Sequence, residues 1–253
     1  MPALAGPRVF RYDESQAILT LLTGRLDDSK GWVPLEDALE AGATRSPGVY
    51  RIRYDGRDVY VGKTANLLNR LTRHARHLRG RQGLDIRRAE CNFVILPPPW
   101  DARTSEDLLI QHYREEGKAP WNFQGFGSND PGRRRDESTP SLYHKEHPAI
   151  PSHHVQIAAG RYTVGRVLRR VKEQLPYLLR YQTDARGGEP GWKEDLDKTV
   201  ELEHDYEGPA DEFLKNLCRS HLPDWQLTYL PLGFILYKEV RNYPSGHALY
   251  TRA

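Results

Sequence analysis

The sequence predicts an α+β protein made of two parts. Of its 253 residues, 38% are hydrophobic and 28% are charged, which leaves enough apolar side chain for a folded core. Two segments typical of strands flank the turn signal Asp55-Gly56, and segments with helical apolar periodicity surround them. A polar stretch then precedes a second part with helix-like and strand-like segments of its own. These observations favour a mixed fold class over an all-α or all-β one.

The first part contains four expected helices around three expected strands. The strand segments are rich in β-branched and aromatic residues, and the helical segments carry apolar residues three and four positions apart. Thr64 is expected to cap the helix after the hairpin, and Thr104 with Asp107 has the spacing of a capping box. The expected helices are residues 15–26, 34–41, 64–78 and 104–116. The expected strands are residues 48–54, 58–62 and 91–96.

The second part follows residues 125–155, which are rich in Gly, Pro and His and are expected to be largely irregular. We expect a first domain over residues 1–150 and an α+β accessory domain over residues 158–253. Reading of DNA sequence and dimerisation are the alternatives for the role of this second domain. Its expected helices are residues 163–182 and 210–221, and its expected strands are residues 226–230, 232–240 and, more weakly, 247–252.

Several classes of protein are excluded by the composition. No apolar run approaches the ~20 residues that cross a bilayer, and the first fifteen residues lack the apolar core of a signal peptide. Cys91 and Cys218 are too few for a disulfide framework or a CxxC metal site. We therefore expect a protein of the reducing cytoplasm without a membrane partner.

Charge is distributed unevenly along the chain. Residues 45–90 hold twelve Lys/Arg against four Asp/Glu, whereas residues 184–212 hold three against eleven. Clustered arginine is typical of proteins that bind a phosphate backbone, although it also occurs on ordinary solvated helix faces. The basic segment is thus compatible with a nucleic-acid partner without requiring one.

Six polar side chains of the first part suit the cleavage of a phosphodiester bond. A carboxylate holds a divalent cation beside a phosphate, an arginine stabilises charge on the phosphate oxygens, and a tyrosine or histidine orients or deprotonates the attacking water. Each residue taken singly also has an ordinary structural explanation, and the ordered set is what favours catalysis. The six are Tyr50, Tyr60, Arg70, His74, Glu106 and Asn122.

These residues resemble the signature of the GIY-YIG nuclease superfamily. Gly48-Val49-Tyr50 stands ten residues before Tyr60-Val61-Gly62, with Val in place of Ile in both half-motifs. The segment APWNFQGFGSNDPG, residues 119–132, is further similar to the type II restriction endonuclease branch of that superfamily. The resemblance covers about residues 10–150. It implies a core of three antiparallel strands flanked by helices, and a DNA endonuclease that uses one divalent ion, Mg²⁺ or Mn²⁺.

The resemblance also implies roles for individual residues. Tyr50 would act on the nucleophilic water as base or as orienter, and Arg70 would hold the scissile phosphate. Glu106 would hold the metal. His74 would serve in proton transfer or accept a hydrogen bond from a tyrosine. Tyr60 would bond the phosphate or line the site. Asn122 would buttress the site, and Lys63 would contact phosphate.

A shared site requires the two tyrosines to lie on one face of the hairpin. A two-residue turn at Asp55-Gly56 pairs residue i with 111 − i and sends Tyr50 and Tyr60 to opposite faces. A three-residue loop with Gly56 in a bulge pairs i with 110 − i and sets Tyr50 opposite Tyr60. The apolar pattern alone mildly favours the first register, but we predict the second because the chemistry needs it.

Two further groups of residues are weaker candidates. Arg133, Arg134 and Arg135 are candidates for contact with a DNA backbone, with a solvated loop as the alternative. The histidines between His144 and His154 match no defensible metal-ligand spacing, so metal binding there is left open.

The sequence thus favours a site-specific type II restriction enzyme that binds double-stranded DNA. Such an enzyme is expected to be a homodimer, because duplex cleavage usually calls for two active sites, and to have a cognate methyltransferase that protects the host. The alternatives are a structure-specific repair nuclease and a catalytically inactive DNA-binding module.

Overall fold

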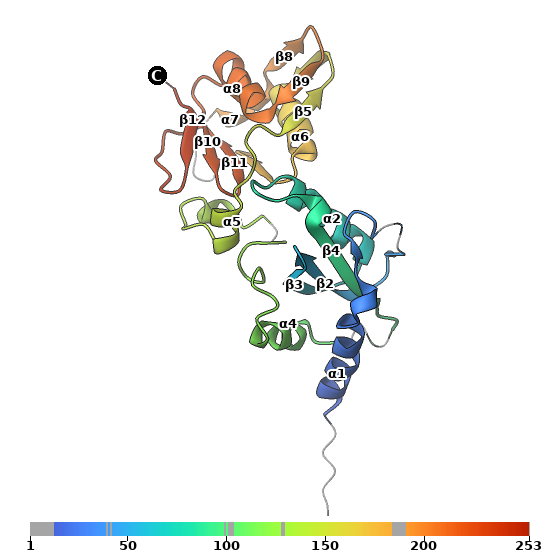
Figure 1. The fold of residues 1–253 in the computed structure, drawn as a ribbon. Coiled ribbons are helices and arrows are strands. Elements are labelled where there is room, and N and C mark those ends of the chain that lie inside the picture. The colour runs from blue at the N-terminus through green and yellow to red at the C-terminus, as the bar shows by residue number, and fades with distance from the viewer. Residues whose placement is uncertain are drawn as a thin grey trace, which may run out of the picture. The chain divides into compact units, whose positions relative to one another are not determined.

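The computed structural model describes residues 13–38, 40, 42–98, 100, 104–127, 130–183 and 191–252. The chain divides into two compact units, which Figure 1 shows as ribbons. Unit 1 comprises Met1–Thr72 and Arg87–Asn122, and unit 2 comprises Arg73–Ile86 and Phe123–Ala253. None of the described helices is long and apolar enough to cross a membrane.

Unit 1 is built on a four-stranded antiparallel sheet of order β1-β4-β2-β3. The three expected strands are confirmed, and a short β1 pairs with the outer edge of β4. The expected helix over 34–41 is wrong where the structure describes it. Pro34 belongs to β1, which a proline tolerates because β1 is an edge strand. The strands are β1 (Val33–Pro34), β2 (Gly48–Tyr54), β3 (Arg57–Thr64) and β4 (Ala89–Ile95).

The register of the β2–β3 hairpin differs from the predicted one. Asp55 and Gly56 both have positive φ, 53° and 71°, so they form a two-residue turn of type I′. Near the turn Arg53 pairs with Asp58, but Ile52 pairs with Tyr60 and Tyr50 with Gly62. Val59 is therefore an extra residue in β3, a β-bulge. The predicted pairing of Tyr50 with Tyr60 is wrong.

The bulge nevertheless places both phenols on one face. Tyr60 stands opposite Ile52, and Ile52 shares a face with Tyr50 because side chains alternate along a strand. Without the extra residue, the two-residue turn would send Tyr60 to the other face. Their ring centroids lie 6.1 Å apart.

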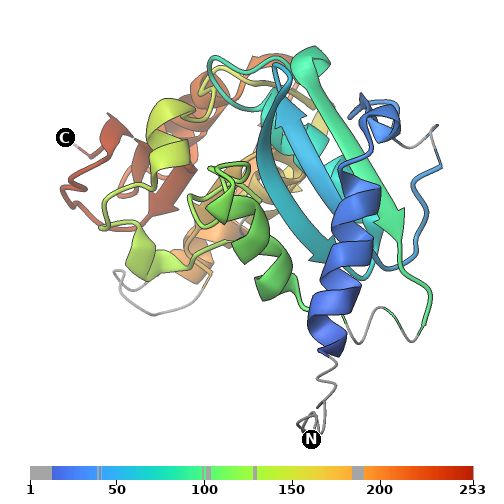
Figure 2. The same cartoon turned by 60° about the horizontal axis from the view of Figure 1, so that its bottom comes forward.

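Two helices of unit 1 cover the other face of its sheet. These are α1 (Glu14–Leu26) and α4 (Glu106–Glu115), which lie on the same side of the strands in Figure 2. Val49 and Val61 are fully buried in the core that these helices form with the sheet. Buried Arg51 on this face pairs with Asp27 and Asp58, so its charge is used inside the fold.

The helix that follows the hairpin, α2 (Leu67–Arg79), continues from unit 1 into unit 2. Two expected helix caps are corrected here. Asn66, rather than Thr64, caps the start of this helix, because Asn66 Oδ1 accepts a hydrogen bond from the amide of Asn69. At α4 the N-cap is Ser105, which accepts from the amide of Leu108. Thr104 instead donates its hydroxyl to the carbonyl of Trp100.

Unit 2 holds a mixed four-stranded sheet of order β12-β10-β11-β7, in which β7 is parallel to β11. The expected helix over 163–182 is shorter than predicted, because Pro176 interrupts it and residues 178–181 form β7. Its helices are α5 (Leu142–Glu146), α6 (Val164–Gln174), α7 (Trp192–Asp197) and α8 (Ala210–His221). The strands of its sheet are β7 (Leu178–Tyr181), β10 (Gln226–Leu230), β11 (Gly233–Tyr237) and β12 (His247–Tyr250).

Two small two-stranded sheets complete unit 2, whose main core lies on one side of the large sheet and whose smaller cluster comprises Leu230, Ile235, Tyr237 and Tyr243. Fully buried Trp225 lies in the main core together with residues of α6, α8 and the large sheet. The small sheets pair β5 (His154–Ile157) with β9 (Tyr206–Pro209), and β6 (Gly160–Thr163) with β8 (Thr199–Leu202). Within the described residues, the 3-10 turns are Ser29–Gly31, Ile86–Arg88 and Arg133–Arg135.

The segment expected to be largely irregular, residues 125–155, is integrated into unit 2 where the structure describes it. Tyr143 is fully buried, and the amide of Ala149 donates to the carbonyl of Pro231. The compact units therefore do not coincide with the division by sequence character at residues 150–158. The assignment of roles to a first and a second domain stays a prediction.

Candidate functional site

Arg70 joins the two tyrosines of the hairpin. It projects from the first turn of α2, and its Nε donates to the hydroxyl of Tyr50 at 2.9 Å. Its Nη2 donates to the hydroxyl of Tyr60 at 3.1 Å. One planar guanidinium thus fixes both phenols by two directional hydrogen bonds, an arrangement that lysine with its single ammonium does not reproduce.

Gly62 makes room for the two phenol rings. A Cβ at this position would lie 2.8 Å from the hydroxyl oxygen of Tyr50 and 3.1 Å from a ring carbon of Tyr60. Gly48 does the same for helix packing, because its Cβ would lie 2.4 Å from a methyl carbon of Leu67. The two glycines of the motif are therefore required for different steric reasons. Gly62 leaves space for the two phenol rings, and Gly48 leaves space for Leu67 at the start of α2.

Burial sets the protonation of this cluster. Tyr50 is fully buried, and desolvation, assisted by the neighbouring Tyr60, raises its pKa well above the ordinary value even though Arg70 opposes the shift. Burial by itself lowers the pKa of Arg70, but its bonds to the two phenols outweigh this and raise the pKa. At neutral pH the cluster is one guanidinium cation facing a neutral Tyr50 phenol.

The outer edge of β3 carries Asn122 and Glu106. The amide group of Asn122 accepts from the N–H of Val61 at 3.0 Å and donates to its carbonyl at 2.8 Å, so it occupies this edge as a neighbouring strand would. Two residues further on, the N–H of Lys63 donates to Glu106 Oε1 at 3.0 Å. Since Tyr50 pairs with Gly62, Glu106 stands one residue beyond that pair along β3.

Lys63 contributes its backbone to this edge and turns its side chain inward. Its Nζ donates to the carbonyl of Thr104 at 3.1 Å, which ties β3 to the segment in front of α4. The ammonium is therefore already engaged by a protein oxygen.

His74 lies one turn beyond Arg70 on α2 and is fully buried. Its ring stacks on Phe126 with centroids 4.7 Å apart and planes 13° from parallel. Phe126 comes from the Gly-Phe-Gly of the segment that resembled restriction enzymes. The apolar neighbour thus gives this histidine a packing role in unit 2, in addition to any role in chemistry.

The three consecutive arginines of unit 2 differ in their surroundings. Arg133 forms an ion pair with Glu239, and its guanidinium lies 3.9 Å from the centre of the Tyr237 ring. Arg134 and Arg135 are exposed. Of these three arginines, Arg133 is therefore engaged in the fold, and the other two are exposed.

A divalent cation fits the site through a single carboxylate. Among the described residues, no group of three or more His, Cys, Asp or Glu side chains is placed to hold a metal ion. Glu106 is exposed at the start of α4 and offers hard carboxylate oxygens. Mg²⁺ is commonly held by one or two carboxylates, with water and substrate phosphate as its other ligands. The donor set fits such an ion only together with a phosphate.

The structure thus brings together Tyr50, Tyr60 and Arg70 by direct hydrogen bonds, with Glu106 and Asn122 on the adjacent strand edge. Sequence reasoning missed the steric role of Gly62. The only sign of this role in the sequence is the position of Gly62 in the second half-motif. The contact of Gly62 with both phenol rings depends on the β-bulge, which the sequence does not show. It also missed a basic cavity in unit 2, since one of its cations, Lys172, lies about a hundred residues from the others in the chain.

The antiparallel sheet with its hairpin phenols and the arginine of the following helix define a nuclease domain of the GIY-YIG class. A family model described as the Eco29kI GIY-YIG domain matches residues 47–175. The chain therefore belongs to the Eco29kI GIY-YIG family of type II restriction endonucleases. A comparison with curated proteins found no match to the chain.

Proposed function

We propose that the protein is a metal-dependent DNA endonuclease that hydrolyses phosphodiester bonds at a specific site, as a type II restriction enzyme does. The observation that supports this most is Arg70, a partly buried cation held by two phenol oxygens next to a strand edge that carries a carboxylate. Membership of the Eco29kI GIY-YIG family supports the restriction type.

Arg70 would stabilise the negative charge that develops on the scissile phosphate. A guanidinium donates several hydrogen bonds in one plane, which matches two phosphate oxygens. Because Tyr50 and Tyr60 already fix its position, little reorganisation is needed when the phosphate arrives, and a pre-oriented cation is the more effective for that reason.

Tyr50 would orient the attacking water rather than deprotonate it. Its raised pKa keeps the phenol neutral at physiological pH, so the hydroxyl acts as a hydrogen-bond partner for the water. Tyr60, held by the same guanidinium, would bond a phosphate oxygen or line the site. The proton of the water then requires another acceptor, and His74 is the proposed one.

Glu106 would hold the metal ion, Mg²⁺ or Mn²⁺. When bound, such an ion polarises the phosphate and lowers the pKa of a coordinated water. Asn122 would buttress the site by fixing the edge of β3, and this role is supported by its two hydrogen bonds to Val61. Lys63 would act chiefly by holding the segment in front of α4, with phosphate contact as its secondary role.

The biological setting follows from this activity. Cleavage of both strands at one site calls for two active sites, so we propose a homodimer on double-stranded DNA. A methyltransferase that modifies the same site would protect the host. Arg134 and Arg135, both exposed, would contact the DNA backbone.

The substitution Glu106→Gln tests the proposal. Incubated with phage DNA and Mg²⁺, the wild-type protein should give discrete bands on a gel, and the variant should give none while still binding DNA. Glu115→Gln is the matched control, because this exposed carboxylate lies at the other end of the same helix. Its cleavage should equal that of the wild type.

Other outcomes of this experiment would contradict the metal assignment or favour a different function. Cutting by Glu106→Gln at the wild-type rate would overturn the metal assignment. Nicking of branched substrates alone would favour a repair nuclease, and binding without any cleavage by the wild type would favour an inactive DNA-binding module.

A further inference from the structure

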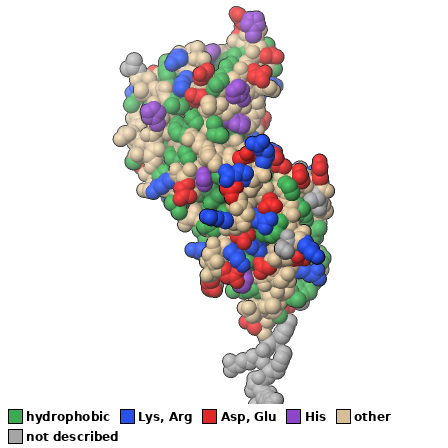
Figure 3. Space-filling model, in the orientation of Figure 1, with side chains coloured by type: hydrophobic (Ala, Val, Ile, Leu, Met, Phe, Trp, Pro, Cys, Tyr) green, Lys and Arg blue, Asp and Glu red, His purple; other side chains and the backbone are tan. Residues whose placement is uncertain are grey.

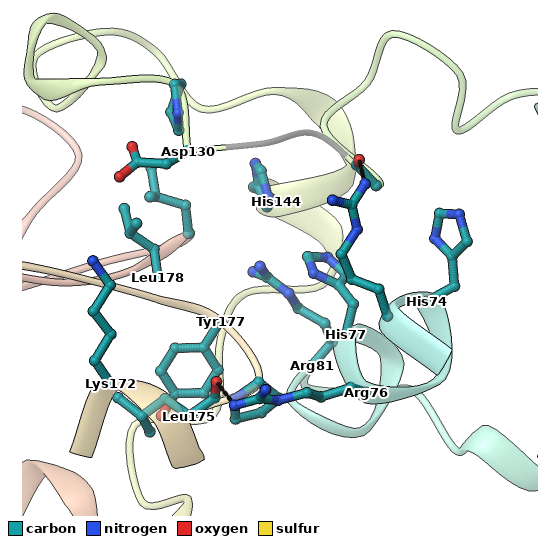
Figure 4. A pocket seen from close by; sticks show the side chains of 15 residues that line it. His74, Arg76, His77, Arg81, Asp130, His144, Lys172, Leu175, Tyr177 and Leu178 are labelled. Carbon is teal, nitrogen blue, oxygen red and sulfur yellow. Dashed lines mark hydrogen bonds between the residues drawn. The ribbon is translucent and has the colours of Figure 1, made fainter. Parts of the chain in front are cut away.

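A cavity of about 290 Å³ lies within unit 2 (Figure 4). Its walls come from the second half of α2, from the end of α6 and from the segment after it. His77 and Arg81 lie on one side of the view, and Lys172 reaches in from the other. Residues far apart in the sequence therefore converge on one pocket that is partly open to solvent.

The cavity is lined by more positive than negative charge. Its cationic side chains are Arg73, Arg76, Arg81 and Lys172. The carboxylate among its lining residues is Asp130, which is already paired with Arg180. The space-filling view shows basic and acidic side chains intermixed over part of the face in view (Figure 3).

Arg81 is the most unusual member of the group. Only 2% of the residue is exposed, and its Nη1 donates to the carbonyl of Pro231 at 2.8 Å. Its Nε has no hydrogen-bond partner, although it is buried. Burial lowers the pKa of Arg81 to about 10. A buried guanidinium with an unsatisfied donor is costly unless an acceptor reaches it.

His77 adds a second buried polar atom without a partner. Its Nε2 accepts or donates no hydrogen bond within the described structure. Burial, with Arg81 as the next cause, holds its pKa well below the ordinary value, so the imidazole is neutral and keeps one N–H to donate. His77 thus adds a second buried polar group without a partner to the residues that line the cavity.

We propose that this cavity binds a phosphate of the DNA backbone other than the scissile one. A phosphodiester carries one negative charge and accepts several hydrogen bonds, which matches guanidinium and ammonium donors around a common space. The proposal rests on the proposed function and extends it to a second DNA contact in unit 2.

The proposed substrate favours a backbone phosphate over a free one. Phosphates recur along each strand of DNA, so a protein that holds one of them at its active site also meets others outside that site.

Lys172→Gln is the test variant, because this side chain is exposed and its loss should leave the fold intact. Binding of a random-sequence duplex is measured by fluorescence anisotropy over a range of salt concentrations, with Glu106→Gln present in every protein to prevent cutting. Loss of one phosphate contact should lower the affinity about three- to tenfold and reduce the slope of log K against log salt by about 1.

Lys145→Gln removes the same charge from an exposed position of α5 outside the cavity and serves as the control. Its affinity and slope should equal those of the parent protein. If Lys172→Gln behaves like this control, the proposal is wrong.

A second measurement separates DNA from free phosphate. Inorganic phosphate should raise the Tm of the parent protein more than that of Lys172→Gln, because ligands that bind the folded state stabilise it. A phosphate effect without any change in DNA affinity would mean that the cavity holds free phosphate, which overturns the proposal. If the wild type binds DNA with the predicted Lys172 dependence but never cuts, the proposed function fails and this inference stands.

Discussion

Tyr50 shows how one residue's chemistry is set by its contacts. The sequence left open whether it acts as a base or as an orienter. Tyr50 is fully buried, and its hydroxyl accepts a hydrogen bond from Arg70. This environment bears on whether the phenol is protonated, and its catalytic role stays a prediction. Because burial raises its pKa, a neutral phenol is what a substrate would meet.

Tyr50→Phe tests the orienting role. Removing the hydroxyl should lower the single-turnover cleavage rate by about 10²-fold, the size typical of a lost catalytic hydrogen bond. Since the phenol remains protonated in the wild type, the ratio of the two rates should stay constant between about pH 6.5 and 9. A ratio that grows with pH over this window would instead identify a phenolate base.

Gly62→Ala tests the steric role of the motif glycine. The added Cβ would push on the hydroxyl of Tyr50 and on the ring of Tyr60. A shift of about 1 Å at a reacting group costs up to ~10²-fold in rate, so cleavage should fall strongly while DNA binding is kept. Gly24→Ala is the control, because its Cβ would meet no atom within 4 Å. Equal rates for the two variants would refute the steric argument.

At the scale of elements, the β2–β3 hairpin decides whether a site exists. The Asp-Gly signal correctly located the turn, but the apolar pattern could not reveal the bulge at Val59. A bulge arises from the competition between turn geometry and packing on both faces, and packing depends on α1, α2 and α4. Val61 lies in the core with α1 and α4. Because side chains alternate along β3, the preceding residue, Tyr60, lies on the opposite face of the sheet.

Gly56→Ala should destabilise unit 1 by straining this turn. Gly56 has a φ of +71°, and a side chain in the left-handed region costs about 1–2 kcal/mol. The free energy of unfolding, measured in urea, should fall by about that amount, whereas Gly24→Ala in α1 should not lower it. An unchanged midpoint for Gly56→Ala would show that the turn relaxes without cost.

Other elements were predicted with errors that have clear causes. The helix expected to run to residue 182 ends at Gln174, and residues after Pro176 join the large sheet beside β11. The pattern of Leu178 and Leu179 suits a helix and a buried strand equally well. Only the neighbouring strand decides between them.

For the whole molecule, the basic excess of residues 45–90 is partly consumed inside the fold. Arg51, Arg53 and Arg88 form ion pairs with nearby carboxylates. The count of charges therefore overstated the cations open to DNA, and the accessible ones must be found from the structure.

Unit 2 should lose stability in mild acid. Burial lowers the pKa of His144 to about 3 and that of His77 well below the ordinary value of about 6.5. Below pH 6.5 the unfolded chain therefore binds more protons than the folded one. The contribution of these two neutral histidines to the free energy of unfolding is complete above pH 6.5 and decreases as the pH falls toward 3. The Tm should drop between pH 7.5 and 5.

His144→Gln should flatten the acid limb of that Tm curve, whereas His204→Gln, at an exposed position, should leave it unchanged. Curves of equal steepness for His144→Gln and the wild type would contradict the assignment.

The oligomeric state is a prediction of the proposed function. Light scattering with a duplex that contains the cleaved site should give a protein mass of two chains. If one chain per site cuts both strands, a second active site is not needed and the proposed homodimer is wrong.

The sequence by itself determined the kind of most elements, the hairpin turn and the set of polar residues, because periodicity, turn chemistry and motif spacing are local properties. The tertiary structure alone decided that Tyr60 joins Tyr50, that Asn122 and Glu106 occupy the edge of β3, and that Lys172 meets Arg81 in one cavity. These outcomes depend on packing between distant segments, where one extra residue in a strand moves a side chain to the other face.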